Sequence, residues 1–253
     1  MNRKVGGAGS NDRRSGTRQK IWGLAGLSLA IFLMVAATNS AAKETTSEDE
    51  PRFQITVRVY NYAGVTGETL LKAEEEGTRI FRKVEVGSAW IDCGSPQLPK
   101  SQASPCQIPL GAITVNMRIL PPAMAARFES SREEMGFALV SGRAGGATDA
   151  WVFYQRVKDA AASDLASASQ ILAYAMAHEI GHLLLGPDHH THEGIMCARW
   201  NLKALEEIGQ GQMLFTRGQA NLIRNELQTR NELAREIMTG RPAPREVAAI
   251  KGK

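Results

Sequence analysis

Two histidines four residues apart, with a glutamate directly after the first, have the spacing of a metal site in this 253-residue sequence: His178-Glu179-Ile180-Gly181-His182. At ~3.6 residues per helical turn, both imidazoles project from one face of a helix and can bind a single ion. Glu179 lies about 100° round the helix from His178, too far round to be an equal third ligand. It is placed instead to remove a proton from a water on the metal. Zinc lowers the pKa of such a water towards ~7, which makes that transfer feasible for a carboxylate.

A different interpretation is that His178 and His182 are core residues whose ring nitrogens bond to backbone carbonyls. The leucines that follow, residues 183–185, would suit such a core helix. Chance alone produces this five-residue pattern in under ~1% of chains of this length, so the pattern favours a metal site.

The segment after the helix also favours a metal site. Gly186 suits the left-handed end of a helix, and Pro187 prevents its continuation, so the chain must turn there. Four of the five histidines lie between positions 178 and 190, and His192 is the fifth. We expect a third ligand from the pair His189-His190, which leaves the fourth position of a zinc ion open for water, as a catalytic site requires.

This stretch, H-E-I-G-H-L-L-L-G-P-D-H-H, resembles the motif of the metzincin proteases, H-E-x-x-H-x-x-G-x-x-H followed by a methionine turn. It has one residue more before the glycine. The family's glycine-to-histidine spacing falls on His189, whereas the extra residue rotates the helix end and can bring in His190. Similar segments of uncharacterised bacterial matrixin-like proteins have their histidine at the place of His190, which is therefore our preferred third ligand. Gly194-Ile195-Met196 resembles the methionine turn, which would place Met196 beneath the metal.

The resemblance covers about residues 172–200 and implies a zinc metalloendopeptidase that hydrolyses peptides or proteins, with Glu179 as general base. Its Zn²⁺ ligands would be His178, His182 and either His190 or His189. In that family the strand before the active-site helix lies at the edge of the cleft and pairs with an extended substrate. Residues 151–157 would be its counterpart here.

Two other functions fit the same motif. One is a non-catalytic zinc-binding interaction domain tethered at the membrane, in which Asp188, His192 or the second of the adjacent histidines is a fourth ligand. The intact Glu179 argues against it, because a structural zinc site has no need of a base. The other is a metal-dependent hydrolase of a non-peptide substrate. The sequence assigns no role to Trp200.

The apolar periodicity predicts one α+β zinc-protease-like domain over residues 52–240, with a small mixed sheet, an active-site helix and a C-terminal helix. Ser163 or Asp164 is the expected cap of the active-site helix. The expected strands are residues 53–60, 84–91, 113–120, 137–140 and 151–157, and the expected helices are residues 67–83, 163–185 and 217–238.

The chain ends differ from this domain. Residues 1–20 hold six basic side chains and one acid, and residues 21–38 form an uncharged apolar run. We interpret residues 21–42 as a signal peptide or a membrane anchor, which puts the body outside the cytoplasm, either secreted, periplasmic or anchored. Residues 43–51 are a linker and residues 241–253 a flexible tail.

The charge balance disfavours nucleic acid as a partner. The net charge of +4 comes from residues 1–20, which carry +5, so the rest of the chain, with 24 basic and 25 acidic residues, has a net charge of −1. The body therefore lacks the basic surface that phosphates require.

Of the three cysteines, Cys93 and Cys106 bracket a proline-rich loop of low apolar content, and Cys197 is the odd one. In an oxidising compartment we expect a disulfide between Cys93 and Cys106, with Cys197 unassigned.

Overall fold

The computed structural model describes residues 51–94, 106, 113–128, 134–139, 149–187 and 189–240. The segments expected as basic tail, signal or anchor, and C-terminal tail lie outside these residues, as does all of the linker except Pro51. None of the described helices is long and apolar enough to cross a membrane. The described elements are β1 (Phe53–Asn61), α1 (Gly67–Arg82), β2 (Val86–Asp92), β3 (Thr114–Leu120), α2 (Pro122–Ala125), β4 (Gly136–Leu139), β5 (Asp149–Phe153), α3 (Tyr154–Ala161), α4 (Ala168–Leu185), α5 (Leu202–Gly209) and α6 (Arg217–Thr239).

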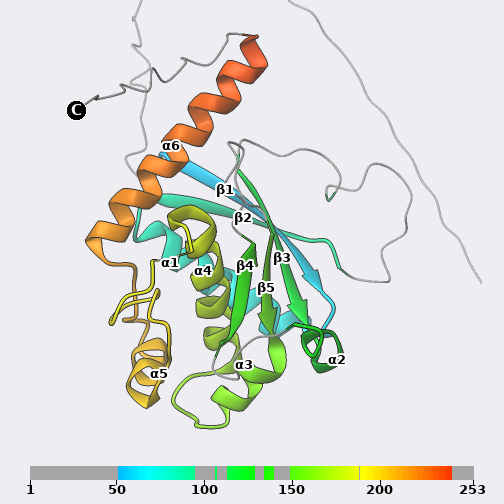
Figure 1. The fold of residues 1–253 in the computed structure, drawn as a ribbon. Helices are drawn as coiled ribbons and strands as arrows, with labels where there is room; N and C mark the ends of the chain where they lie inside the picture. The colour runs from blue at the N-terminus through cyan, green and yellow to red at the C-terminus, as the bar shows by residue number, and fades with distance from the viewer. Residues whose placement is uncertain are drawn as a thin grey trace, which may run out of the picture. The chain divides into compact units, whose positions relative to one another are not determined.

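The five described strands form one mixed sheet in the order β2-β1-β3-β5-β4 (Figure 1). β1 pairs in parallel with β2 and β3, and β3 pairs in parallel with β5, whereas β4 runs antiparallel to β5. The side chains of Phe53, Ile55, Val57 and Val59 in β1 are buried, and those between them are exposed or half-buried, as in a strand with one face on the core. The prediction of a mixed α and β domain with a small mixed sheet is confirmed.

The expected strand over residues 151–157 is wrong in its second half. The strand β5 ends at Phe153, and the chain continues directly into α3. Val157 is fully buried, and Tyr154, Ala160 and Ala161 pack against the core. Their spacing of three to four residues is that of one helix face. The short segment also fits the alternation of a strand, but burial of this face favours the helix.

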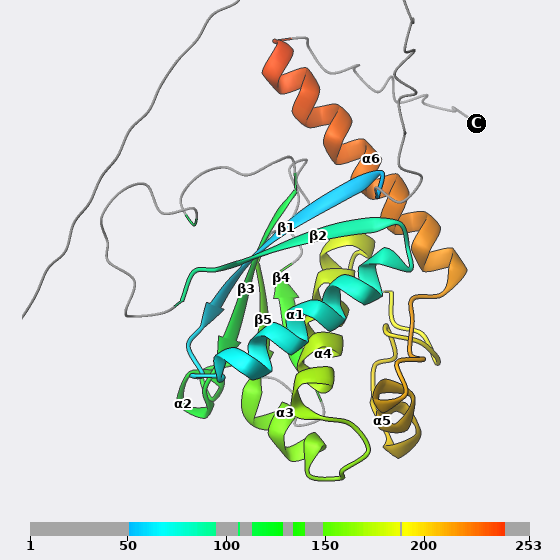
Figure 2. The ribbon, with the colours of Figure 1, turned by 180° about the vertical axis from the view of Figure 1, so that it is seen from behind.

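The helices α1 and α4 lie side by side against the sheet (Figures 1 and 2), with α4 also contacting β4, α3, α5 and α6. Almost every residue of α4 from Ile171 to Leu185 is buried. A helix that is apolar on all sides is stable only where protein surrounds it, so α4 is the central element of the core. This placement gives the histidines of α4 a rigid support.

The helix α4, which the sequence predicted as an active-site helix, begins later than expected. Ser167 is its N-cap, and Ser167 and Gln170 form a capping box in which each side chain bonds to the backbone of the other residue. Two bonds to otherwise unpaired backbone N–H groups stabilise this start. Ser163 and Asp164 instead lie in the turn between α3 and α4, where Asp164 has a φ of 58°.

The last helix, α6, matches its expected range to within one residue and starts with a second capping box, between Thr216 and Gln219. The short helices α2 and α5 were not expected.

The expected disulfide is present: Cys93 and Cys106 are bonded, with their Cα atoms 5.6 Å apart. Cys197 is free and half-buried.

Candidate metal centre

His178 and His182 project from the same face of α4, and their Nε2 atoms are 3.1 Å apart. The other ring nitrogen of each histidine donates a hydrogen bond to a backbone carbonyl. Nδ1 of His178 bonds to the oxygen of Ile195 at 2.7 Å, and Nδ1 of His182 bonds to the oxygen of Gly186 at 3.3 Å. These bonds fix the ring orientations and leave the Nε2 lone pairs of both rings directed at a shared point, as in metal-ligating histidines.

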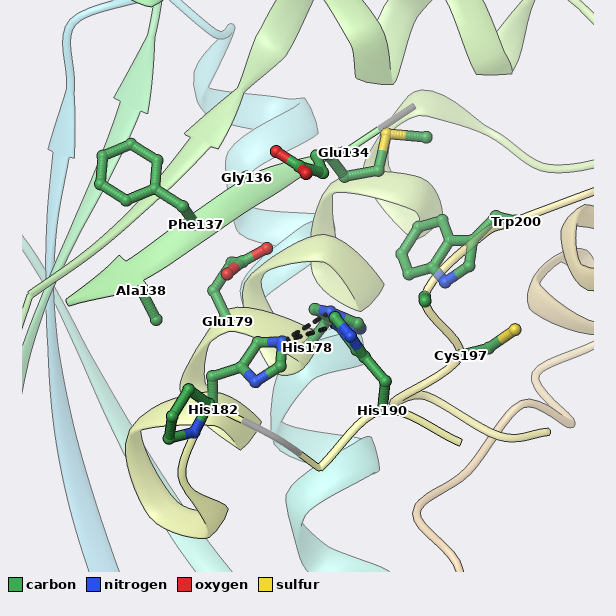
Figure 3. Close-up of a pocket in the computed structure, with 13 residues that line it drawn as sticks. Glu134, Gly136, Phe137, Ala138, His178, Glu179, His182, His190, Cys197 and Trp200 are labelled. Atoms are coloured by element: carbon green, nitrogen blue, oxygen red, sulfur yellow. Dashed lines mark hydrogen bonds between the residues drawn. The ribbon is translucent and has the colours of Figure 1, made fainter. Parts of the chain in front are cut away.

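His190 is the third member of this group. Gly186 ends α4 with a φ of 98°, and the chain turns back so that Nε2 of His190 lies 3.1 Å from Nε2 of His182. The hydrogen bond from Thr191 N to the oxygen of Met196 holds the returning segment in place. The three ligand atoms lie within 4.8 Å of one another, and dashed lines in Figure 3 mark the two close pairs.

The other candidate ligands lie apart from this group. The imidazole of His189 packs at Gly186, and its Nδ1 is buried with no hydrogen-bond partner among the described residues. His192 is exposed and does not belong to the group. Asp188 lies outside the described residues. Within the described part of the chain, the candidate metal-binding group therefore consists of three histidines.

The geometry and charge state of the group fit zinc. Two nitrogens bound to a tetrahedral zinc at ~2.0–2.1 Å lie ~3.3 Å from each other, close to the 3.1 Å of both neighbouring pairs. Burial lowers the pKa of the His178 imidazole to about 4 and also lowers the pKa of His182. Both rings are thus neutral at pH 7, which is the form that binds a metal.

Glu179 is buried beside the histidines, with 3% of its surface exposed. Its Oε2 has no hydrogen-bond partner among the described residues. Burial raises the pKa of this carboxyl well above its usual value, and the charge of Glu134 raises it further. A buried, unsatisfied carboxylate is costly in a structural core, whereas next to a dication the charged form is favoured and a water can bond to it. This oxygen is a second observation that fits a catalytic zinc.

Gly194-Ile195-Met196 forms a tight turn beneath the histidines, with Cys197 N bonded to the oxygen of Gly194 at 3.0 Å. Met196 is fully buried. Its thioether lies against Gly181 of α4, where a Cβ would overlap the sulfur. The turn thus packs on the helix that carries the histidines, and Ile195 supplies the carbonyl that orients His178.

The histidines and Glu179 open into a cleft of about 260 Å³. One wall is the start and body of β4, including Gly136, Phe137 and Ala138. The facing wall is the chain after the methionine-containing turn, including Cys197, Ala198 and Trp200. Figure 3 shows Glu179 between the histidines and β4. Trp200 contacts His178 edge to face, with ring centroids 6.2 Å apart.

The strand at the cleft is β4 rather than the segment 151–157. β5 has partners on both sides, β3 and β4, so it is interior to the sheet. β4 is the last strand of the described sheet and lines the cleft. Sheet order depends on contacts between distant segments, so no local sequence pattern predicts this exchange. Gly136 is also a site residue that sequence reasoning missed: a Cβ there would overlap the oxygen of Trp151 and lie 2.9 Å from Oε1 of Glu179.

Neither a protein-family model nor a curated protein matches this sequence. Among solved structures, archaemetzincin from Methanopyrus kandleri is similar over 69% of this chain and 96% of its own chain. The TM-score is 0.40 and the sequence identity 16%. A likeness at this level assigns neither a family nor a function, and the site geometry therefore carries the functional argument.

Proposed function

We propose that this protein is a zinc-dependent peptidase. The observation that carries the proposal is the convergence of three imidazole nitrogens, from His178, His182 and His190, beside the buried and unsatisfied carboxylate of Glu179. A three-histidine set leaves one position of a tetrahedral zinc for water or substrate, which is the arrangement of catalytic rather than structural sites.

Each side chain has a defined role in this proposal. The three histidines would hold zinc, which when bound polarises a substrate carbonyl and lowers the pKa of water towards ~7. Glu179 accepts the proton of the attacking water and delivers it to the leaving amine. Its buried position beside β4 keeps the carboxylate within the cleft and away from bulk solvent, where its basicity is tuned by burial and by the ion.

The edge strand β4 supports a peptide as the substrate. Its free edge in the described sheet borders the cleft, and the backbone of an extended peptide can pair with it by β-augmentation. The backbone N–H and C=O groups at a strand edge can pair with any extended peptide, whatever its side chains. They cannot form the same row of hydrogen bonds with a compact small molecule. This favours a peptide over the non-peptide substrate that the motif alone also allows.

A non-catalytic zinc-binding domain is the competing function. It calls for a fourth protein ligand, and His192 does not belong to the histidine group of the described residues. It also leaves the buried Glu179 without a role.

Placement outside the cytoplasm is part of our proposal, and the Cys93–Cys106 disulfide supports it because such bonds persist in oxidising compartments.

The experiment that tests the proposal compares the wild-type chain with Glu179→Gln in zinc content and in cleavage of an unstructured peptide library. Because Glu179 is a base and not a ligand, we expect the variant to keep its zinc and to lose at least ~100-fold in turnover. Full turnover by the zinc-loaded variant contradicts the assigned role of Glu179. No cleavage by zinc-loaded wild type, across the library, favours the non-catalytic domain.

A further inference from the structure

One part of the cleft combines apolar walls with a carboxylate at the rim. Glu134, immediately before β4, and Trp200, after the methionine-containing turn, both line the cleft together with Met135. Of the described lining residues, only Glu134 and Glu179 carry carboxylates. Glu179 is buried at the histidines, whereas Glu134 is exposed. Figure 3 shows Glu134 and Trp200 on the far side of the cleft from His182.

The position of Glu134 is fixed by its backbone. Arg156 donates a hydrogen bond to the oxygen of Glu134, and the guanidinium of Arg156 lies over the ring of Phe153, 4.2 Å from its centroid. The next residue is also held, because Phe153 N bonds to the oxygen of Met135 at 2.8 Å. These contacts engage the main chain and leave the side chain of Glu134 at the rim. Arg156 also interacts electrostatically with the Glu134 carboxylate, because burial lowers the pKa of its guanidinium and the charge of Glu134 opposes that shift. A substrate cation would share this carboxylate with Arg156.

Glu134 also lies close to the reacting groups. Both carboxylates line the same cleft, and Gly136, two residues after Glu134, lies so close to Glu179 that a Cβ on it would be 2.9 Å from Oε1 of Glu179. A substrate side chain adjacent to the bond being cleaved can therefore reach Glu134 without leaving the cleft.

Trp200 supplies the second half of this environment. Its indole is half-buried and packs edge to face on His178, at an interplanar angle of 82°. Met135 lines the same cleft, so the lining next to the histidines includes two apolar side chains. Lysine and arginine have the matching chemistry: an aliphatic stem that packs on apolar side chains, and a cationic end that pairs with a carboxylate or an aromatic face.

We propose that Glu134 and Trp200 form a subsite that selects substrates with a lysine or arginine side chain next to the scissile bond. This inference rests on the proposed peptidase function, since it names the side chain that the same cleft accepts. A purely apolar subsite, formed by Met135 and Trp200 alone, is the alternative that the test must separate. The difference between them is the charge of Glu134.

A binding experiment tests the subsite independently of turnover. Lysine hydroxamate and norleucine hydroxamate share a zinc-chelating group and an aliphatic stem, and only the first has a terminal cation. Their dissociation constants are measured by calorimetry with the zinc-loaded full chain, as wild type, Glu134→Gln and Glu134→Lys. Leu139→Ala, an exposed substitution further along β4, is the matched control.

We expect wild type and Leu139→Ala to bind the lysine probe about fivefold more tightly than the norleucine probe, the effect of one partly exposed ion pair. Glu134→Gln should abolish this preference and Glu134→Lys should reverse it. Equal affinities in wild type, a preference that survives Glu134→Gln, or failure of both probes to bind overturns the subsite.

Turnover then separates the two proposals. Matched peptides that differ only by lysine or norleucine at each position are incubated with wild type and Glu134→Gln. Cleavage that favours lysine at one position, only in wild type, supports both. A probe preference without cleavage of any peptide keeps the subsite and contradicts the peptidase. Cleavage of the peptides with no preference for lysine supports the peptidase and contradicts the subsite.

Discussion

Gly181 and Met196 are so close that a Cβ on Gly181 would overlap the thioether sulfur of Met196. The two residues lie on different elements, the helix α4 and the turn beneath it. Phe215 closes the same space, 3.1 Å from that Cβ position. Gly181 is therefore required by packing: it lets the methionine-containing turn approach the helix at the level of the proposed metal ligands.

The first prediction concerns this contact. An interior helical Gly→Ala change ordinarily stabilises by about 1 kcal/mol, but at Gly181 the overlap should dominate. We expect Gly181→Ala to lower the free energy of unfolding by about 1–3 kcal/mol, the usual cost of overpacking. Urea denaturation measures it, with Gly218→Ala, where a Cβ meets only Thr216 Oγ1 at 4.0 Å, as the control. Shortening the Met196 side chain in the Gly181→Ala variant should recover part of the lost free energy of unfolding. If the effects of the two substitutions on that free energy simply add, the contact is contradicted.

The second prediction concerns Gly136, which lets β4 approach Glu179. In Gly136→Ala, the new methyl group would overlap the oxygen of Trp151 and press on Oε1 of Glu179, so either the strand or the carboxylate must move. We expect zinc content to be unchanged and kcat/KM for peptides to fall by at least ~10-fold, because displacement of a catalytic group by a fraction of an ångström is costly. Leu139→Ala, which changes an exposed side chain of the same strand, should leave kcat/KM unchanged.

The third prediction concerns the end of the active-site helix. The side chain of Arg230 on α6 donates a hydrogen bond to the oxygen of Leu183 at 2.6 Å and pairs with Glu226. The carbonyls of the last helical turn have no donor within the helix, so this bond satisfies a group next to His182. Arg230→Met should lower the free energy of unfolding by about 1–3 kcal/mol. Arg235→Met, at an exposed position of the same helix, should change it by less than ~0.5 kcal/mol. If urea denaturation shows the same change in the free energy of unfolding for both substitutions, the stabilising role of the Arg230 hydrogen bond is contradicted.

The sequence was most informative where the signal was local. The spacing of His178 and His182 placed both on one helix face, because helical periodicity needs no tertiary contact to act. The alternation in residues 53–60 likewise predicted β1. The start of α4 was locally encoded as well, since Ser167 and Gln170 have the spacing of a capping box. Asn201 before Leu202, Leu205 and Ile208 is a comparable local signal for α5, because a capping residue precedes apolar residues at helical spacing.

Other features depend on how distant segments meet. His189 and His190 are the same residue type, and only the path of the chain after Gly186 brings the ring of His190, and not that of His189, to His182. The exchange of β4 for β5 at the cleft edge follows from sheet order, which no window of sequence contains. For the same reason, the roles of Gly136 and Glu134 are invisible before β4 is placed beside α4.

The central claim is that His178, His182 and His190 hold one zinc ion, and the adjacent histidine provides its own control. Zinc content of the purified full-length chain is measured by mass spectrometry for wild type, His190→Ala and His189→Ala, after equilibration with buffered zinc. We predict one zinc per chain in wild type and in His189→Ala, and loss of zinc at the same free concentration in His190→Ala. Retention of zinc by His190→Ala together with its loss in His189→Ala would contradict the site described above. A folded wild-type chain without zinc would contradict the peptidase proposal itself.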